Sequence, residues 1–247
     1  MQLLPAQIAL RNYADESSRV TALRFFKTGP SQYGEGDEFI GVRVPCTRQI
    51  ARQYQDLSLQ DITHLLESRV HEDRLLALII MCLQYQKSTP TGKDMLTKFY
   101  VSQLSRVNNW DLVDTSAYHI LGESLSINEA PYAILTNLAK SHNVWERRVS
   151  IIATFALLKR KRPEETLRIA QILLHDPHDL IQKAVGWMLR EMGKRCNEDI
   201  LTSFLTIHAS HMPRTMLRYA IEKLSAKNRA YFLALRSQSL EIGMRKK

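Results

Sequence analysis

The sequence has few of the features that mark secreted or membrane proteins. Its 247 residues contain three cysteines, Cys46, Cys82 and Cys196, an odd number at long separations, so neither a disulfide framework nor a paired-cysteine zinc site is indicated. The most apolar stretches, 75–83 and 149–158, are too short to span a bilayer, and no basic segment followed by a long apolar run opens the chain. We therefore expect a cytoplasmic protein with no membrane partner.

The sequence also contains no pattern typical of a metal site, a nucleotide-binding site or a catalytic nucleophile. Two histidine pairs three residues apart, His175 with His178 and His208 with His211, have no accompanying Cys or His-Glu-x-x-His pattern. No serine, cysteine or lysine nucleophile stands beside an evident base. We expect no metal and no cofactor.

One long irregular stretch, residues 33–45, contains three glycines but lacks the Gly-Lys-Ser/Thr ending of a phosphate-binding loop. We interpret it as an ordered connector rather than a nucleotide site. Its apolar side chains are expected to close one end of the core: Phe39, Ile40, Val42 and Val44.

Positive charge is concentrated in the second part of the chain. Residues 140–247 hold 21 Lys and Arg against 10 Asp and Glu, a net charge of +11, whereas residues 1–139 hold 13 against 15, a net charge of −2. A basic surface confined to part of a protein is typical of a polyanion-binding protein, and nucleic acid is the commonest polyanion in a cytoplasm. The alternative is a solvated basic face without a ligand.

Helical periodicity runs through nearly the whole chain, and strand patterns are almost absent. Helices are predicted at 2–14 and 16–28, at 59–68 with 72–87, 92–104 with 110–125, 129–140 with 144–160, 164–174 with 179–194 and 198–208 with 213–225, and near 227–237. Equivalent points in the second helices of these pairs are Arg74, Arg147, Lys183 and Leu217. This pattern predicts an all-α, HEAT-like helical-repeat solenoid, curved, with a basic concave face. We expect a single domain over 1–247, with the N-terminal helices and connector in 1–45 and the repeats in 46–247.

The segment 109–114, Asn-Trp-Asp-Leu-Val-Asp, is the first candidate site. Trp110 and Asp114 are four residues apart and so share one face of a helix. That face flanks the helix's apolar stripe, where a concave surface would meet solvent. The alternative is that Trp110 is a core edge and Asp114 a structural ion-pair partner.

Two later helices carry further candidates. Arg148 lies by helical angle within an apolar face, so its guanidinium needs a fixed anion, either Asp114 or a bound phosphate. Trp187 lies with Lys183 and Arg190 away from its helix's apolar stripe, which favours a platform for sugar or base beside a phosphate. The alternative is that Trp187 is wedged under a neighbouring repeat. Other DNA-binding candidates are Arg147, Arg214 and Arg218.

Three motifs resemble those of the AlkD-like DNA alkylation-repair glycosylases, a family of HEAT-like solenoids. They are Trp-Asp-Leu-Val-Asp at 110–114, Asn-Val-Trp-Glu-Arg-Arg at 143–148 and Ile-Gln-Lys-Ala-Val-Gly-Trp-Met-Leu-Arg-Glu at 181–191, and the likeness covers most of the chain from about Phe39 onward. The resemblance implies that Trp110, Asp114 and Trp187 are catalytic and that Arg148 is the active-site arginine. It also implies hydrolysis of the N-glycosidic bond of cationic N3- or N7-alkylated purines, such as 3-methyladenine and 7-methylguanine, in double-stranded DNA without base flipping.

These residue types suit that reaction. An alkylated purine departs as a neutral base, and a carboxylate at Asp114 would stabilise the oxocarbenium-like sugar and position water. Trp110 and Trp187 would offer their π faces to the developing positive charge. We expect a cytoplasmic monomer that is nucleoid-associated when bound to DNA. Two alternatives stay open, a non-catalytic protein that binds DNA structures and a HEAT-like protein-interaction scaffold.

Overall fold

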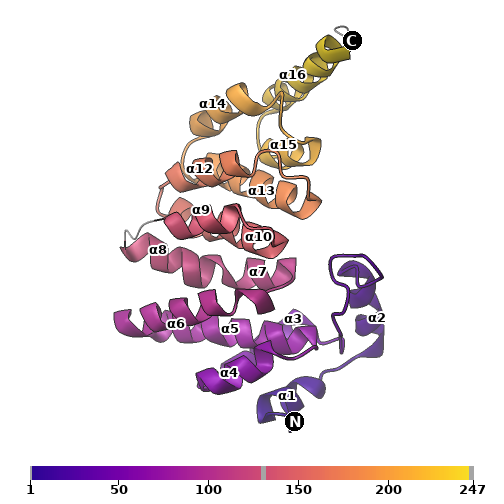
Figure 1. Ribbon diagram of the computed structural model, residues 1–247, viewed down its shortest axis with the longest axis vertical. Coiled ribbons are helices and arrows are strands. Elements are labelled where there is room, and N and C mark those ends of the chain that lie inside the picture. Colours follow the sequence, from indigo (N-terminus) through magenta and orange to yellow (C-terminus); the bar gives the residue numbers. More distant parts are fainter. Residues whose placement is uncertain (1, 129–131, 245–247) are drawn as a thin grey trace. The chain divides into compact units, whose positions relative to one another are not determined.

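The computed structural model describes residues 2–128 and 132–244, which form helices and turns with no strand (Figure 1). The predicted all-α class is therefore confirmed. The chain divides into two compact units, residues 1–124 and 125–247, and in each most helices stack one after another along the chain, while the helix at 16–25 lies to one side of the stack of unit 1 (Figure 1). The single domain and the basic concave face stay predictions. Within the described residues, no helix is both long and apolar enough to cross a membrane.

Unit 1 is built around α5 (His71–Lys87), which is buried on nearly all sides. Its residues 75–81 are at most 7% exposed, as expected of a helix in the centre of a core. Packed against it are α3 (Val44–Gln53), α4 (Leu59–Leu66) and α7 (Trp110–Ser116). The other elements are α1 (Pro5–Arg11), α2 (Glu16–Phe25), α6 (Pro90–Ser102), a 3₁₀ turn (Leu104–Arg106), a π-helical turn (Tyr118–Gly122) and α8 (Glu123–Asn128), which runs across the boundary.

Unit 2 is built around α13 (Asp179–Arg195), which packs against α10 (Val144–Ala153), α11 (Phe155–Lys159), α12 (Glu164–Ile172), α14 (Glu198–His208) and α15 (Arg214–Ala220). It also contains α9 (Ala133–Ala139) and α16 (Ala226–Met244). Gly186 allows the close approach of α15, because a Cβ at this position would lie 2.5 Å from the carbonyl oxygen of Met216.

Several predicted helix limits are wrong. The sequence predicts no helix over 44–53, yet α3 lies there, with Pro45 in its first turn and Thr47, Ile50 and Ala51 buried at helical spacing. The helix predicted over 110–125 is interrupted by the π-helical turn, in which the Gly122 amide donates to the Ala117 carbonyl at 2.9 Å. The helix predicted over 144–160 is interrupted between α10 and α11. Because π-helical turns are rare and occur as single turns inside α-helices, a continuous helix is the expectation from the apolar spacing.

A shared arginine contact supports the predicted repeat equivalence of α5 and α10. In each helix the arginine, Arg74 or Arg147, donates through Nη1 to the backbone carbonyls six and five positions earlier in the chain. Each guanidinium also pairs with an aspartate: Arg74 with Asp37 at 2.5 Å and Arg147 with Asp176 at 2.7 Å. Both arginines thus tie the loop before their own helix to a neighbouring segment.

The connector at 33–45 is ordered and fixed to α5. Phe39 and Val42 are 5% and 7% exposed, so their predicted place in the core is confirmed, whereas Val44 is 44% exposed and lies outside it; Ile40 is half-buried. The buried Glu72 carboxylate accepts hydrogen bonds from three successive backbone amides, those of residues 40–42, at 2.8 to 3.2 Å. A charged acceptor satisfies these three buried donors, so this part of the connector needs no strand partner, whereas Glu38 forms a single parallel bridge with Val70.

We expect Gly41→Ala to destabilise the protein more than Gly36→Ala does. Both glycines have positive φ, +80° and +86°, but a Cβ at Gly41 would lie 2.0 Å from the Asp15 carbonyl oxygen, whereas one at Gly36 would have no neighbour within 4 Å. The backbone strain alone costs about 1 kcal/mol, and the clash raises the loss at Gly41 to about 3 kcal/mol. Urea unfolding measures both values, and equal losses would contradict the close packing of α2 on the connector.

Candidate active site

The N-terminus of α7 carries the first two predicted site residues. Trp110 is the first residue of the helix and Asp114 lies one turn later, and both are half-buried. Asn109 caps the helix by accepting from the Trp110 amide at 2.8 Å, and its own side-chain amide donates to Asp37 at 3.1 Å. The start of α7 is therefore held by the connector as well as by α5.

A hollow of about 340 Å³ lies against this face of α7. Trp110 and Asp114 both line it, so the prediction that they share a face is confirmed. Opposite walls come from α3, with Arg48, and from α5, with Cys82 and Gln86. The hollow lies wholly within unit 1, so its geometry depends only on how the helices of that unit pack around α5.

The indole of Trp110 is oriented by residues that precede it by more than 70 positions. Its Nε1 donates to the Tyr33 hydroxyl at 3.2 Å. The Phe26 ring stacks on it with 5.2 Å between centroids, and the Phe25 ring meets it edge-on at 5.4 Å. Ring contacts of both kinds are favourable arrangements of aromatic quadrupoles. One side of the indole is thus covered by α2 and the connector.

A buried charge bridge lies beside Trp110 and joins α5, α7 and the connector. His71, 2% exposed at its side chain, donates through Nε2 to Asp111 at 2.7 Å and through Nδ1 to Asp37 at 3.1 Å. Only an imidazolium can donate from both nitrogens. Burial disfavours that charge, but the carboxylates of Asp111 and Asp37 outweigh it and raise the pKa of His71 to about 9. Burial likewise opposes the charge of Asp37, yet His71, Arg74 and Asn109 hold its pKa below the usual value.

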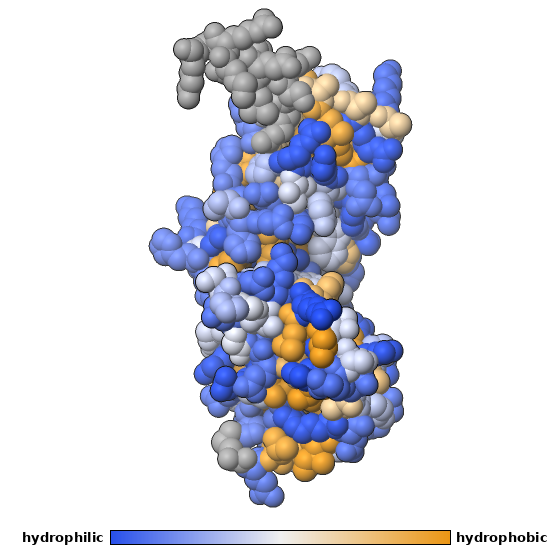
Figure 2. All heavy atoms as spheres, turned by 90° about the vertical axis from the view of Figure 1, so that its right-hand side faces the viewer, coloured by the Kyte–Doolittle hydropathy of each residue, from blue (hydrophilic) through white to orange (hydrophobic). Residues whose placement is uncertain are grey.

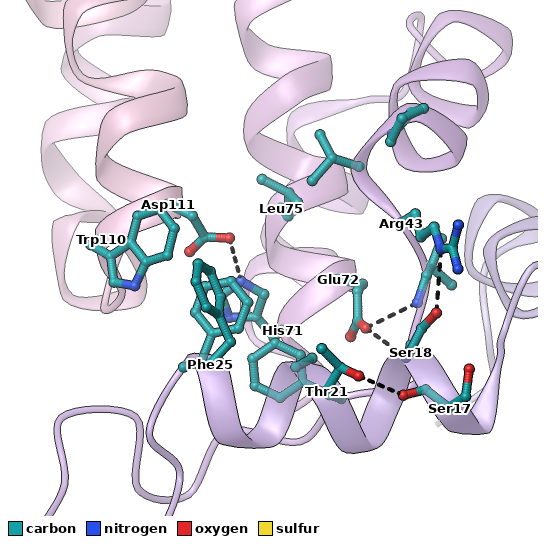
Figure 3. A pocket seen from close by; sticks show the side chains of 17 residues that line it. Ser17, Ser18, Thr21, Phe25, Arg43, His71, Glu72, Leu75, Trp110 and Asp111 are labelled. Carbon is teal, nitrogen blue, oxygen red and sulfur yellow. Dashed lines mark hydrogen bonds and ion pairs between the residues drawn. The ribbon is translucent and has the colours of Figure 1, made fainter.

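A second cavity, of about 570 Å³, also borders Trp110 (Figure 3). Trp110, Phe25 and His71 lie at one end of it, and Ser17, Ser18 and Arg43 at the other (Figure 3). It shares Trp110 and Asp111 with the first hollow. Helix α2 borders this cavity without burying any of its own residues. In the face shown in Figure 2, apolar patches interrupt the hydrophilic surface of unit 1, and Phe25 is 62% exposed.

The other two predicted site residues belong to unit 2. Arg148, on α10, is 5% exposed, and its Nη1 donates to the Leu180 carbonyl at 2.5 Å. Trp187, on α13, is half-buried. The structure thus brings Trp110 and Asp114 together on one wall, while convergence of all four residues stays a prediction.

Most predicted DNA-binding cations of unit 2 already have protein partners. Lys183 pairs with Asp179 at 2.6 Å, and Arg190 pairs with Glu222 and with Glu191. Arg147 is held by Asp176, and Arg214 donates to the Leu233 carbonyl at 3.3 Å, whereas Arg218 is exposed on α15. The pair of Lys183 with Asp179 is exposed, and surface ion pairs of this kind are weak and exchange readily for phosphate, whereas the side chains of Arg147 and Arg190 are only 17% and 18% exposed. The assignment of these residues to DNA binding stays a prediction.

Sequence reasoning missed four residues that shape the site: Tyr33, Asp37, Arg48 and His71. Asp37 and Tyr33 lie in the connector, where no periodicity indicates a direction. Arg48 reaches the site because it lies on helix α3, which the sequence pattern did not predict. His71 comes directly before an apolar run, where nothing in the sequence distinguishes a functional histidine from a structural one. In the described part of the chain, no group of three or more His, Cys, Asp or Glu side chains is arranged to hold a metal ion.

Comparison with known proteins gives one family. The model of the DNA alkylation repair enzyme family matches residues 6–224. A solved structure described as a predicted DNA alkylation repair enzyme from Enterococcus faecalis aligns with a TM-score of 0.66 at 14% identity, covering 86% of this chain and 97% of that one. AlkD2 from Streptococcus mutans aligns with a TM-score of 0.48 at 18% identity, covering 90% and 97%. No curated protein matches the sequence significantly.

We expect the stability contributed by His71 to disappear at alkaline pH. The folded-state pKa of about 9 lies above the ordinary value of 6.5. The charge bridge therefore stabilises fully below about pH 6.5, by about 3 kcal/mol, and this contribution is lost as the pH rises through about 9. The difference in unfolding free energy between the wild type and His71→Gln, measured by urea unfolding from about pH 6 to about pH 10, should shrink accordingly. A difference independent of pH would show that His71 is neutral.

Proposed function

Because the chain belongs to the DNA alkylation repair enzyme family, we propose that it is a monofunctional DNA glycosylase acting on cationic N3- and N7-alkylated purines in duplex DNA. The observation that carries the proposal is the pairing of the Asp114 carboxylate with the Trp110 indole on one wall of the same hollow. A carboxylate beside an aromatic face is suited to a reaction in which positive charge develops on a sugar.

In the proposed reaction, the bond between N9 of the purine and C1′ of the deoxyribose breaks, and both bonding electrons leave with the base. The base was cationic and departs neutral, so general-acid catalysis is not required. The oxocarbenium-like sugar is stabilised by Asp114, which also orients the water whose oxygen bonds to C1′. The proton lost by that water passes to the carboxylate and then to solvent, and no metal or cofactor takes part in these steps.

Trp110 would contact the deoxyribose with the face that Phe26 leaves uncovered. The Tyr33 hydrogen bond and the stacked Phe26 ring limit rotation of the indole, so its orientation exists before DNA binds. Trp187 would offer a second aromatic face. Arg148, which is 5% exposed, would direct its charge at a phosphate.

The proposal includes recognition of the lesion through the backbone and without base flipping. Lys183, Arg190, Arg147, Arg214 and Arg218 would contribute to binding by exchanging protein carboxylates and carbonyls for phosphates. A cytoplasmic monomer that acts on chromosomal DNA is part of the same proposal. Affinity for duplex DNA should then fall steeply with salt, since each phosphate contact releases counterions.

We expect Asp114→Asn to lower the rate of base release by about 100-fold or more without weakening binding to duplex DNA. The measurement is single-turnover release of 3-methyladenine and 7-methylguanine from methylated duplex DNA, followed by chromatography. Asp56→Asn is the matched control, because Asp56 is exposed and lies outside the hollow. This control should release both bases at the wild-type rate.

The alternatives give different results in the same assay. A non-catalytic DNA-binding protein would bind duplex DNA in a salt-sensitive way and release no base in any variant. A protein-interaction scaffold would bind DNA no better than other basic proteins, and charge reversal at Lys183 and Arg190 would leave this binding unchanged. Absence of release by the wild type would refute the enzymatic proposal.

A further inference from the structure

Arg48 is the cation of the hollow that contains Asp114. It lies on α3, is exposed, and lines the hollow together with Asp114 and Trp110. Within the described residues it forms no hydrogen bond and no ion pair, unlike Arg11, Arg74 and Arg147, whose guanidinium groups are held by aspartates. An arginine that lines a hollow without a protein partner keeps all five of its N–H donors for a ligand.

The positive charge of Arg48 affects the pKa of two residues that line the hollow. Burial raises the pKa of the Cys82 thiol to about 12, and Arg48 is the charge that opposes this rise. Burial also raises the pKa of Tyr118, and Arg48 again opposes it. Cys82 and Tyr118 both line the hollow, on α5 and on the π-helical turn. The guanidinium therefore lies close enough to the hollow to act on groups from two different walls.

The hollow otherwise has an acidic wall. Asp111 and Asp114 are both among its lining residues, and Asp111 accepts a hydrogen bond from the His71 imidazolium. A deoxyribose placed against Asp114 brings its own two flanking phosphates close to that carboxylate, because they are bonded to the same sugar. Two like charges at short range repel each other unless a cation lies between or beside them. Arg48 is in the position to supply that cation.

We propose that Arg48 binds a phosphate of the DNA strand that carries the alkylated nucleotide, and that the exposed Gln86 amide is a second donor to the same group. This phosphate site rests on the proposed function, because it assumes that DNA enters the Asp114 hollow. A planar guanidinium binds phosphate through two parallel hydrogen bonds, which fixes the direction of the strand as well as its position. Since α3 and α7 both pack on α5, the phosphate site and Asp114 have a fixed separation within unit 1.

The experiment uses a duplex with one tetrahydrofuran abasic site, which binds without being cleaved at a glycosidic bond. Single phosphates on both sides of that site are replaced, one at a time, by neutral methylphosphonates, and affinity is measured by fluorescence anisotropy. For the wild type, neutralising the phosphate bound by Arg48 should weaken binding roughly tenfold. For Arg48→Gln, the same replacement should have almost no further effect, and the slope of log affinity against log salt should be smaller by about 1.

Two variants serve as controls. Arg69→Gln also removes an exposed arginine, but Arg69 pairs with Glu38 outside the hollow, so this variant should keep the full methylphosphonate effect. Arg48→Lys should keep the salt dependence and lose part of the affinity, because lysine retains the charge without the two-pronged geometry. Unchanged circular dichroism and unfolding midpoints would show that all three variants are folded.

The outcomes separate the phosphate site from the glycosylase proposal. The phosphate site is refuted if Arg48→Gln and each methylphosphonate lower the affinity by independent factors that multiply. It is also refuted if Arg48→Gln binds with the affinity of the wild type. Both conclusions hold whatever the result of the base-release assay. If coupling appears at one phosphate but no base is released from methylated DNA, the phosphate site stands and the glycosylase activity is refuted. Coupling at one phosphate together with base release supports both.

Discussion

The buried bridge from Asp37 through His71 to Asp111 is the interaction on which the candidate site depends. It joins the connector, α5 and α7 through two hydrogen bonds from one imidazolium. Asp37 also accepts hydrogen bonds from Arg74 and Asn109. Asn109 caps α7, and Arg74 holds the loop before α5, so one carboxylate fixes both segments. Removal of Asp37 would take this carboxylate from two buried cations, His71 and Arg74, at once, which makes the network cooperative. The direction of α7, and hence of Trp110 and Asp114, follows from it.

The connector does more for this site than its lack of periodicity indicates. Tyr33 orients the Trp110 indole, Asp37 anchors the bridge, and Glu72 fixes residues 40–42 through their backbone amides. Gly41 lies so close to α2 that no side chain fits there. An irregular segment can hold this geometry because buried charged acceptors, together with the backbone bridge at Glu38, replace the hydrogen bonds that a regular strand or helix would supply. The connector, which contains no recognisable motif, therefore positions Trp110, which belongs to the motif at 110–114.

Charge is distributed differently from what composition suggests. The excess of Lys and Arg in the second part of the chain favours a polyanion, yet Arg147, Lys183 and Arg190 all contact acidic side chains of unit 2. Unit 1 has a slight excess of acidic residues in its sequence, but its hollow contains Arg48 without an ion-pair partner among the described residues. Net charge sets the long-range field that attracts DNA, whereas the direct contacts depend on which cations the fold leaves without partners.

The sequence by itself determined the helical class, the family and the shared face of Trp110 and Asp114, because each depends on spacing along one helix or on a local motif. It also indicated the equivalent places of Arg74 and Arg147 in the repeat. Only the tertiary structure decided that Tyr33, Asp37 and His71 meet at α7, that a π-helical turn follows Asp114, and that Arg48 shares the hollow with it. These residues are separated by tens of positions or lie in segments without periodicity. Their proximity results from packing around α5, and no local pattern encodes such packing.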